Sequence, residues 1–386
     1  MSHTVRKICI VVHSRANYGR IKSVMRAVQA HPDLELQLVI GASALLYRFG
    51  SVRDIIEKDG FLPNSTVYTV VEGETPATMA KSTGLGIIEL ASIFEQLRPD
   101  VVLSVADRFE TMSTAIAASY MNIPLAHTQG GELTGSIDET VRHAITKLAH
   151  LHFPATRKAA TLLRQMGEES ERIIVTGCPA IDLVVESLRD RDISVLEQYG
   201  GTGGAIDFSA PYLVLLQHPV TTEYGQGYAQ IKASLDAIRQ FSMQTVILWP
   251  NADAGSDYIS KGLRLYRERN PGIPLHFYRN FAPEDYVQLI KHCACQIGNS
   301  SSAIREGTYL GIPAVNVGSR QDCRERGSNV LDAPYDVDAI ATAIRTQLDH
   351  GPYPANHLYG DGTAGTQIAA ALATVPLSIT KRFQEL

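Results

Sequence analysis

The stretch NSSSAIREGTYLGIP, residues 299–313, places three hydroxyls and a carboxylate at the beginning of a predicted helix. One serine is enough to cap a helix, because one side-chain oxygen satisfies a free N–H group of the first turn. The additional hydroxyls of Ser301 and Ser302, beside free N–H groups at a positive helix end, are typical of a diphosphate site. Glu306 lies one turn further and suits two neighbouring ribose hydroxyls. The stretch therefore predicts a nucleoside diphosphate site.

Basic side chains that can meet the same phosphates follow other predicted strands. GSRQDCRERG offers Arg320, Arg324 and Arg326 in a predicted loop, which is more positive charge than the loop itself needs. Arg15 lies in the turn after the first strand, where it either meets an anion or stays on the surface. His218 ends another strand and can bind or protonate a leaving phosphate, although a histidine before proline is also common in ordinary loops.

Carboxylates gather after two strands of the first half of the chain. Asp107 follows the apolar run DVVLSV and is either a catalytic base or a helix cap. Glu132 follows two glycines, and Asp138 opens a helix in which Arg142 stands at i+4, so we expect these two to pair. Carboxylates held close together raise the pKa of one of them, which suits general acid and base catalysis.

The elements that must position these residues alternate between buried strands and amphipathic helices, which predicts a doubly wound α/β fold with mostly parallel sheets. The predicted strands are residues 7–13, 34–40, 100–105, 123–127, 172–177, 212–218, 244–250, 273–278, 295–299 and 312–317. The clearest predicted helices are residues 17–30, 78–97, 108–120 and 137–149. In such sheets ligands bind beyond the carboxyl ends of the strands, where the strand order reverses.

A length of 386 residues favours two domains. The alternation breaks where Gly200, Gly201, Gly203 and Gly204 cluster, and no Gly-Lys-Ser/Thr follows to make a phosphate loop. We therefore predict a first domain over 1–190, a linker or exposed excursion over 191–210, and a second domain over 211–365. Residues 366–386 are predicted to form a helix that crosses back to the first domain. The predicted site lies in the cleft between the domains.

Composition excludes several classes of function. A net charge of -5 and 19% charged residues do not favour a nucleic-acid or membrane-surface partner. The sequence has no apolar run of 18 residues, and its first apolar run reads as a strand. Five scattered cysteines fit a reducing cytoplasm and do not complete a metal site. The absence of GxGxxG counts against NAD and FAD.

Seven motifs occur in order over nearly the whole chain: SRANYGRIK, ADRFET, HTQGGELTGSIDETVRHAITKLAHLHF, TGCPAIDLV, QHPVTTE, GNSSSAIREG and GSRQDCRERGSNV. They resemble the UDP-N-acetylglucosamine 2-epimerase family, and within it the hydrolysing branch of the sialic acid pathway. The resemblance implies two Rossmann-like domains facing across a cleft, as in GT-B glycosyltransferases. It also implies a reaction without cofactor or metal: the C2 proton leaves, UDP is expelled to give a glycal, and water adds to give N-acetylmannosamine.

The resemblance also implies roles for individual residues. Catalytic roles fall to Asp107, Glu132, Asp138 and His218. Positions around the UDP are Arg15, Ser301, Ser302, Glu306 and Arg320, with His218 near the leaving group. Sugar-binding positions are Gln129 and Arg142. The family commonly forms dimers or tetramers, so we expect at least a dimer.

Gln129 departs from the family pattern HxEGGE, in which a glutamate follows the histidine by two residues. A glutamine cannot exchange a proton as a glutamate does, so another carboxylate takes that role or Gln129 only positions the sugar. The departure leaves two substrates open, UDP-N-acetylglucosamine and a UDP-linked 2,4-diacetamido-2,4,6-trideoxyhexose of the legionaminic acid route. A non-hydrolysing epimerase, a GT-B glycosyltransferase and a binding protein without turnover are the further alternatives.

Overall fold

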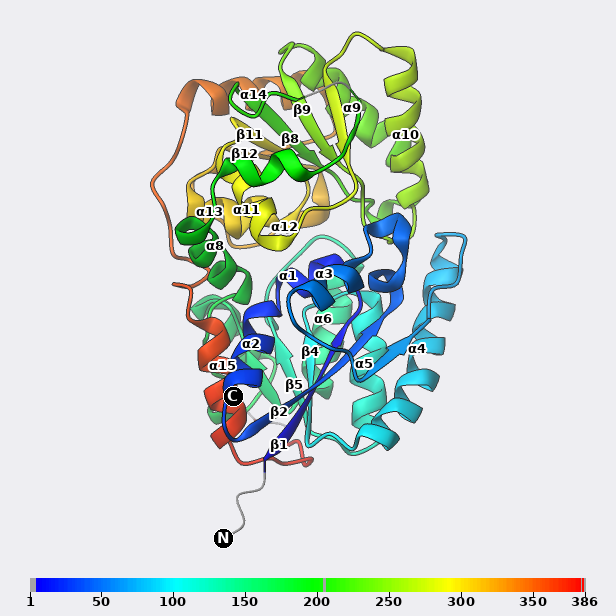
Figure 1. Ribbon diagram of the computed structural model, residues 1–386, viewed down its shortest axis with the longest axis vertical. Helices are drawn as coiled ribbons and strands as arrows, with labels where there is room; N and C mark the ends of the chain where they lie inside the picture. Colours follow the sequence, from blue (N-terminus) through cyan, green and yellow to red (C-terminus); the bar gives the residue numbers. More distant parts are fainter. Residues whose placement is uncertain (1–4, 204–205, 383, 385–386) are drawn as a thin grey trace.

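One parallel sheet and one mostly parallel sheet, one in each half of the chain, organise the computed structural model, which describes residues 5–203, 206–382 and 384 (Figure 1). Parts of three predictions lie outside the described residues: the first four residues of the first domain, Gly204 of the linker, and residues 383, 385 and 386 of the terminal helix. Within the described part of the chain, none of the helices combines the length and the apolarity that crossing a membrane requires.

The first domain is the unit built on a six-stranded sheet in which all neighbours are parallel. Its strands are Arg6–Val12 (β1), Leu34–Gly41 (β2), Ser65–Val67 (β3), Val101–Val105 (β4), Leu125–Thr128 (β5) and Leu151–Phe153 (β6). Its helices are Arg15–Gly19 (α1), Lys22–Ala30 (α2), Val52–Lys58 (α3), Pro76–Leu97 (α4), Phe109–Tyr120 (α5), Ile137–Leu148 (α6), Arg157–Gln165 (α7) and Pro179–Asp190 (α8). The strand order β3-β2-β1-β4-β5-β6 reverses between β1 and β4, as in doubly wound nucleotide-binding folds.

The second domain is built on a seven-stranded sheet of order β13-β12-β11-β8-β9-β10-β7, which reverses between β8 and β11. Its strands are Thr202–Gly203 (β7), Tyr212–Leu216 (β8), Gln244–Leu248 (β9), Leu275–Tyr278 (β10), Cys295–Gly298 (β11), Ala314–Val317 (β12) and Val330–Ala333 (β13). Its helices are Gly227–Arg239 (α9), Ser256–Arg269 (α10), Pro283–Lys291 (α11), Ser301–Ile304 (α12), Glu306–Leu310 (α13) and Val337–His350 (α14). The predicted doubly wound α/β fold, mostly parallel, is thus confirmed.

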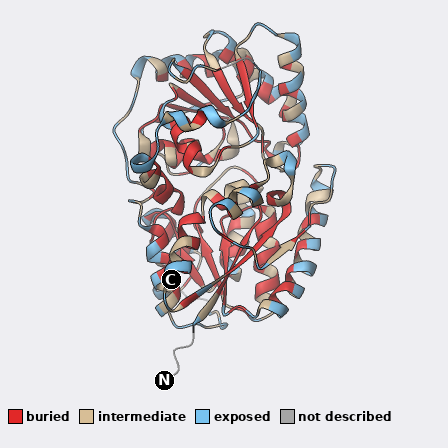
Figure 2. Ribbon diagram, in the orientation of Figure 1, coloured by how far each residue is buried: buried red, intermediate tan, exposed pale blue. Residues whose placement is uncertain are grey.

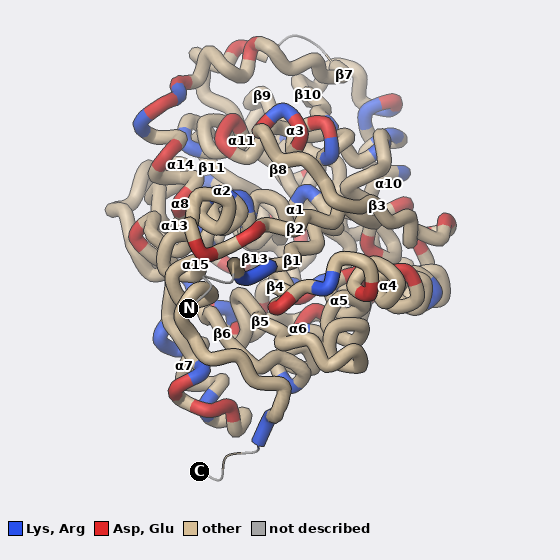
Figure 3. The backbone as a smooth tube through the Cα atoms, turned by 60° about the horizontal axis from the view of Figure 1, so that its bottom comes forward, with Lys and Arg blue, Asp and Glu red and all other residues tan. Residues whose placement is uncertain are grey.

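Both faces of each sheet are buried, which explains why the strands read as continuous apolar runs (Figure 2). Successive residues of β1 point to opposite faces, so Ile8 and Ile10 join the core under α2, whereas Cys9 and Val11 join the core under α4 and α5. Lys, Arg, Asp and Glu are spread over both domains (Figure 3).

The last helix, Ala364–Thr374 (α15), returns to the first domain and packs along α2, as Figure 1 shows in red beside blue. Ile368 and Leu372 complete the core under β1. Asp182 of α8 accepts the first free N–H groups of α15, those of Ala364 and Gly365, at 3.0 and 2.7 Å. The helix ends at Thr374, earlier than predicted, because the following segment runs extended along the first domain.

The two chain crossings between the domains lie side by side. The Cys178 N–H donates to the Tyr359 carbonyl at 2.7 Å. Gly177 and Gly360 face each other, and a Cβ on either would stand about 3.0 Å from the Cα of the other. Both have positive φ, 83° and 123°, which glycine adopts without strain. The absence of two side chains therefore lets the crossings touch.

Three predicted elements differ from the structure. Residues 172–177 do not form the predicted strand. They lie beside the edge strand β6, where Ile173 makes one isolated bridge to His152 and Val175 is exposed. The predicted helix 17–30 breaks into α1 and α2 at Arg20. The predicted linker or excursion carries a 3-10 helix (Ile193–Gln198) whose Leu196 is buried in the second domain, and β7 pairs antiparallel with the edge strand β10.

The glycines of α4 provide a test of the packing that supports the carboxyl end of β4. A Cβ at Gly86 would stand 2.6 and 2.8 Å from Oγ and Cβ of Ser113 in α5, whereas a Cβ at Gly84 would meet nothing within 4 Å. We expect Gly86→Ala to lower the free energy of unfolding by about 1–3 kcal/mol through overpacking. Gly84→Ala should raise it by up to about 1 kcal/mol through helix propensity. Urea unfolding of both variants measures the difference, and equal effects would contradict the close packing of α4 on α5.

Candidate functional site

The points at which the two sheets reverse their strand order face each other across one cavity. Arg15 follows β1 and Asp107 follows β4 in the first domain, while His218 follows β8 and Ser300 follows β11 in the second. Side chains of all four line the cavity. A further apolar part of the wall comes from Leu183, Leu216, Leu248, Phe281, Pro283 and Val287. The cavity therefore lies where doubly wound sheets bind their ligands.

The end of β11 is held against β8 by a glycine and an asparagine. Gly298 has φ of +120°, and a Cβ there would lie 2.2 Å from the Leu216 carbonyl, so only glycine fits. The side chain of Asn299 accepts the His218 N–H at 2.7 Å and donates to the His218 carbonyl at 2.9 Å. These contacts fix the histidine and the serines that follow Asn299 on one wall.

The three serines divide their work. Ser300 caps α12, because its hydroxyl accepts the Ser302 N–H at 3.3 Å. The Ser302 hydroxyl contacts Oγ of Ser300 at 3.0 Å and the Tyr286 hydroxyl at 2.7 Å. The Ser301 hydroxyl accepts a bond from Arg20 at 2.5 Å. All three line the cavity, so one cap and two further hydroxyls lie where the sequence predicted them.

His218 is held as a neutral ring. Its Nδ1 accepts the Asn251 N–H at 3.2 Å, which places the ring proton on Nε2. Burial lowers the pKa of His218 well below its usual value, and the arginines nearby, Arg320 foremost, lower it further. A neutral imidazole with a proton on Nε2 can donate a hydrogen bond to a phosphate, but it is a poor cationic acid at neutral pH. His218 was predicted either to bind or to protonate a leaving phosphate, and the geometry favours binding.

Glu306 lies on the cavity wall at the start of α13, and its Oε2 is buried without a hydrogen-bond partner. Burial raises the pKa of this carboxyl, although Arg20 and Arg305 oppose the effect. The predicted continuous helix breaks at Arg305 into two short helices, and the break sends Glu306 toward the cavity and Arg305 away from it. An unpartnered carboxylate oxygen is suited to accept hydroxyl hydrogens.

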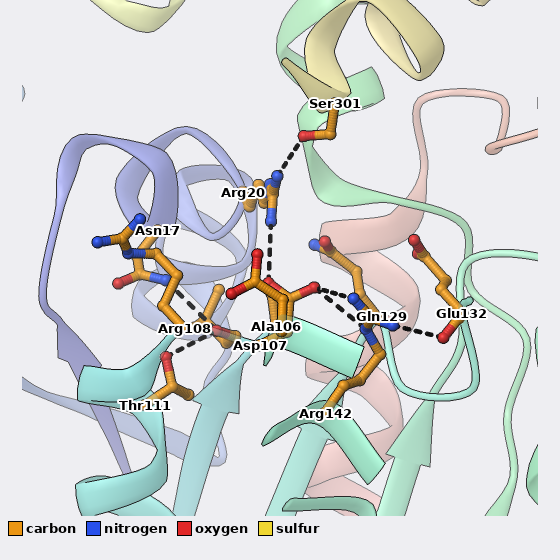
Figure 4. A network of polar contacts seen from close by, with 12 residues as sticks. Asn17, Arg20, Ala106, Asp107, Arg108, Thr111, Gln129, Glu132, Arg142 and Ser301 are labelled. Atoms are coloured by element: carbon orange, nitrogen blue, oxygen red, sulfur yellow. Dashed lines mark hydrogen bonds and ion pairs between the residues drawn. The ribbon is translucent and has the colours of Figure 1, made fainter. Parts of the chain in front are cut away.

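Three arginines connect the walls. Arg20, which the helix break between α1 and α2 releases, donates to Ser301 and stands 3.9 Å from Oδ1 of Asp107 (Figure 4). Arg320 donates to the Asn299 carbonyl at 3.1 Å and to Oδ2 of Asp138 at 3.2 Å. Arg15 crosses the cleft to the Arg279 carbonyl at 2.9 Å. The cavity thus has cationic groups from both domains.

Asp107 is an ionised carboxylate. Its Oδ2 accepts from Nε and Nη2 of Arg142 at 3.1 and 2.5 Å (Figure 4). Burial alone would raise the pKa of Asp107, but Arg142, Arg20 and Arg324 outweigh it and hold the pKa far below its usual value. Ala106, immediately before it, has φ of +60°, and this uncommon conformation turns the chain where β4 ends.

Asp138 lies beside the cavity, bound to its lining residue Arg320 but not itself part of the lining, and its pKa is shifted in the opposite direction from that of Asp107. Burial raises the pKa of Asp138, and Arg320 opposes the shift. The carboxylates of Asp107 and Asp253 raise it further. The predicted Asp138–Arg142 pair is wrong, because a cation from the other domain binds Asp138 while Arg142 turns inward to Asp107. Two carboxyl groups with pKa values shifted in opposite directions are a typical acid and base pair.

Glu132 and Gln129 belong to a buried cluster behind the cavity. Arg305 donates to Oε1 of Gln129 at 2.7 Å and to Oε2 of Glu132 at 2.5 Å. Arg324 stands 3.5 Å from Glu132. Burial would raise the pKa of Glu132, but Arg305, Arg324 and Arg142 together lower it. Among the described residues, neither Glu132 nor Gln129 is part of the cavity lining.

Sequence reasoning missed several cavity residues and misplaced two. Arg20, Tyr286, Asn251 and Arg108 line the cavity although none was a candidate. A signal for Arg20 was its distance of five residues from Arg15, which allows both to face one site only if the helix breaks between them. Arg324 and Arg326, predicted to have charge for phosphates, instead bind Glu132 and Asp332. Among the described residues, no group of three or more His, Cys, Asp or Glu side chains is placed to hold a metal ion.

Comparisons with known proteins agree with this geometry. A sequence profile described as UDP-N-acetylglucosamine 2-epimerase matches residues 26–373. The chain is 33% identical over 376 residues to UDP-N,N'-diacetylbacillosamine 2-epimerase (hydrolyzing) of Legionella pneumophila, covering 97% of each chain. It is 28% identical over 393 residues to UDP-N-acetylglucosamine 2-epimerase of Neisseria meningitidis, covering 99% of this chain and 100% of the other.

Solved structures share the fold. The crystal structure of UDP-GlcNAc 2-epimerase from Neisseria meningitidis bound to UDP-GlcNAc has a TM-score of 0.79 at 18% identity, covering 95% of this chain and 99% of that chain. The Methanocaldococcus jannaschii enzyme in complex with UDP-GlcNAc and UDP has a TM-score of 0.77 at 16% identity, with coverage of 95% and 99%. The predicted arrangement of two facing Rossmann-like domains is therefore confirmed.

The buried cluster behind the cavity predicts a large difference between two arginines. Arg305→Met keeps side-chain volume but leaves Glu132 without its direct cation, so we expect the free energy of unfolding to fall by about 3–5 kcal/mol. Arg53→Met is the matched control, because Arg53 is 43% exposed and pairs with Glu57 on the surface of α3. Its loss should leave the free energy of unfolding nearly unchanged, because an exposed ion pair contributes little to stability. Denaturant titration measures both, and similar values would show that the cluster does not stabilise the fold.

Proposed function

Since the chain belongs to the UDP-N-acetylglucosamine 2-epimerase family, we propose that it is the hydrolysing type of this enzyme. It converts UDP-N-acetylglucosamine and water into N-acetylmannosamine and UDP. The C2 proton leaves, the bond between C1 and the UDP oxygen breaks to give a glycal, and water then adds across the double bond. The product would feed the synthesis of sialic acids. The observation that carries the proposal is a cavity lined by residues of both domains. It joins a cradle for a diphosphate in the second domain, the serine cradle formed by Ser300, Ser301 and Ser302, to Asp107 in the first.

The second domain provides the groups that a departing UDP needs. The Ser301 and Ser302 hydroxyls and the Nε2 proton of His218 are neutral donors. Arg320 and Arg20 provide positive charge on either side of them. Because a diphosphate gains negative charge as the C1 bond breaks, donors fixed on a rigid wall stabilise the transition state more than the ground state. Glu306 fits the ribose hydroxyls and the apolar wall fits the uracil ring.

The first domain provides proton transfer. Asp107 faces the cavity as an ionised carboxylate and is assigned to remove the C2 proton. Asp138, whose pKa lies above its usual value, is assigned to return a proton to C2 on the other face of the sugar. Glu132 and Gln129 act behind them, through Arg305, and position the site. This assignment removes the need for a glutamate at position 129.

A second substrate is favoured by a specific observation. The Legionella relative, at 33% identity, carries the name of an enzyme for UDP-N,N'-diacetylbacillosamine, which is a UDP-linked 2,4-diacetamido-2,4,6-trideoxyhexose. The cradle for UDP is the same for either sugar, so the choice depends on groups around C4 and C6 of the hexose. The predicted assembly of two or more copies also belongs to this proposal.

The test is incubation with each UDP-sugar in D2O, followed by NMR. We expect free UDP and a free 2-epimerised sugar with deuterium at C2, because the hydrogen added to C2 comes from the Asp138 carboxyl, which exchanges with D2O. The sugar released faster identifies the substrate. A UDP-linked epimer without free sugar would contradict the hydrolysing type, and the absence of turnover with UDP still binding would indicate a binding protein.

Two variants should separate chemistry from binding. Asp107→Asn removes the base but keeps the shape of the side chain, so we expect turnover to fall by about 10²–10⁴-fold with UDP affinity nearly unchanged. Ser302→Ala removes one hydrogen bond to phosphate, about 1 kcal/mol, so we expect roughly fivefold weaker UDP binding. Coupled UDP-release kinetics and calorimetry measure the two effects. Normal turnover of Asp107→Asn would exclude it as the base.

A further inference from the structure

Arg320 is shared between the two walls of the cavity in a way that a ligand would disturb. It comes from a 3-10 turn (Ser319–Gln321) after β12 of the second domain. Nη1 donates to the Asn299 carbonyl at the start of the serine cradle, and Nη2 donates to Asp138 of the first domain. The same guanidinium therefore touches the carboxylate and borders the space where the cradle would hold a diphosphate.

Arg320 is the cation bound directly to Asp138 among the described contacts. Arg108 also faces Asp138, but its guanidinium is already bound to Glu110 at 3.0 Å and to Asp253 at 3.0 Å. Asp107 and Asp253 also face this carboxylate, and both repel a negative charge there. Arg142 of the same helix attracts a negative charge on Asp138, but its guanidinium is bound to Asp107 and Glu139.

We propose that a bound diphosphate takes Arg320 away from Asp138, and that Asp138 takes up a proton from solvent in exchange. The inference rests on the proposed function, because it requires a UDP-sugar in the cavity. Removing the one direct cation and adding two negative charges both disfavour an ionised carboxylate. The diphosphate, which later becomes the leaving group, thus causes Asp138 to be protonated before the reaction begins.

Asp107 responds differently to the same ligand. Its two bonds come from Arg142, which is fully buried and, among the described residues, is not part of the cavity lining. Even if Arg20 turned from Asp107 to the diphosphate, Arg142 would keep Asp107 ionised. Binding of one ligand therefore leaves Asp107 ionised as the base and Asp138 protonated as the acid. After elimination, Asp138 gives its proton to C2, water gives hydroxyl to C1, and the remaining water proton returns to Asp138.

The pH dependence has a definite sign. Because the pKa of Asp138 is higher in the complex than in the free protein, binding takes up protons at pH values between the two. Within that window ligand affinity falls as pH rises. Above the window Asp138 is ionised in both states, and below it Asp138 is protonated in both, so the proton uptake disappears on either side.

Calorimetry in buffers of different ionisation enthalpy measures this uptake without any turnover. The probe is UDP-glucose, because the terminal phosphate of UDP itself titrates near pH 6, whereas the diphosphate of UDP-glucose has no such group. We expect the wild-type protein to take up as much as about one proton per ligand at mildly acidic pH. Asp138→Asn and Asp138→Ser should bind the probe with no uptake.

Arg320→Gln and Arg326→Gln form the matched pair. Arg320→Gln removes the cation before ligand arrives, so we expect a smaller uptake together with weaker binding. Arg326 lies in the same loop but binds Asp332, which is 61% exposed, so Arg326→Gln should keep the wild-type uptake. Binding without uptake in the wild-type protein, or uptake that persists in both Asp138 variants, would overturn the inference alone. No binding of UDP or UDP-glucose would overturn the proposed function as well.

Discussion

Burying a carboxylate requires a cation beside it, and this requirement organises the site. Asp107 and Glu132 are each only 5% exposed, so an ionised form of either is stable only against arginines. Arg142 comes from the first domain, while Arg305 and Arg324 come from the second. Both carboxylates therefore have all their cationic partners only when the two domains lie together. The same contacts that lower the energy of the fold also lower the pKa values of these two carboxyl groups.

The neutral side chain of Gln129 adds to this arrangement. Arg142, Arg305 and Arg324 are matched by three carboxylates whose pKa values are lowered, those of Asp107, Glu132 and Glu139. The positive and negative charges of this cluster therefore balance while residue 129 is neutral. The amide accepts the hydrogen bond of Arg305 without neutralising it. A glutamate in its place would add a fourth negative charge to three arginines.

The sequence predicted the groups that follow strands better than those released by breaks in helices. Apolar runs mark the ends of β4 and β11, so Asp107 and the serine cradle were placed from local pattern alone. Arg20 and Arg305 were missed as site residues because each stands where a predicted helix breaks, and the breaks depend on tertiary contacts. The Asp138–Arg142 pair failed for a related reason: i+4 spacing considers one helix, whereas Arg320 approaches from the other domain. The prediction of a strand at residues 172–177 was wrong, because an apolar run does not show whether a neighbouring strand pairs with it along its length.

The side-by-side crossings at Gly177 and Gly360 make the first domain discontinuous in sequence. Its core includes Ile368 and Leu372 of α15, whereas the sheet of the second domain is contained between Thr202 and Ala333. On the ribosome the second domain can therefore fold although it begins later in the chain, while the first domain still lacks α15. Until α15 emerges, the groove beside α2 and the apolar face of β1 stay open. We expect the synthesis of α15 to control when the core of the first domain can close.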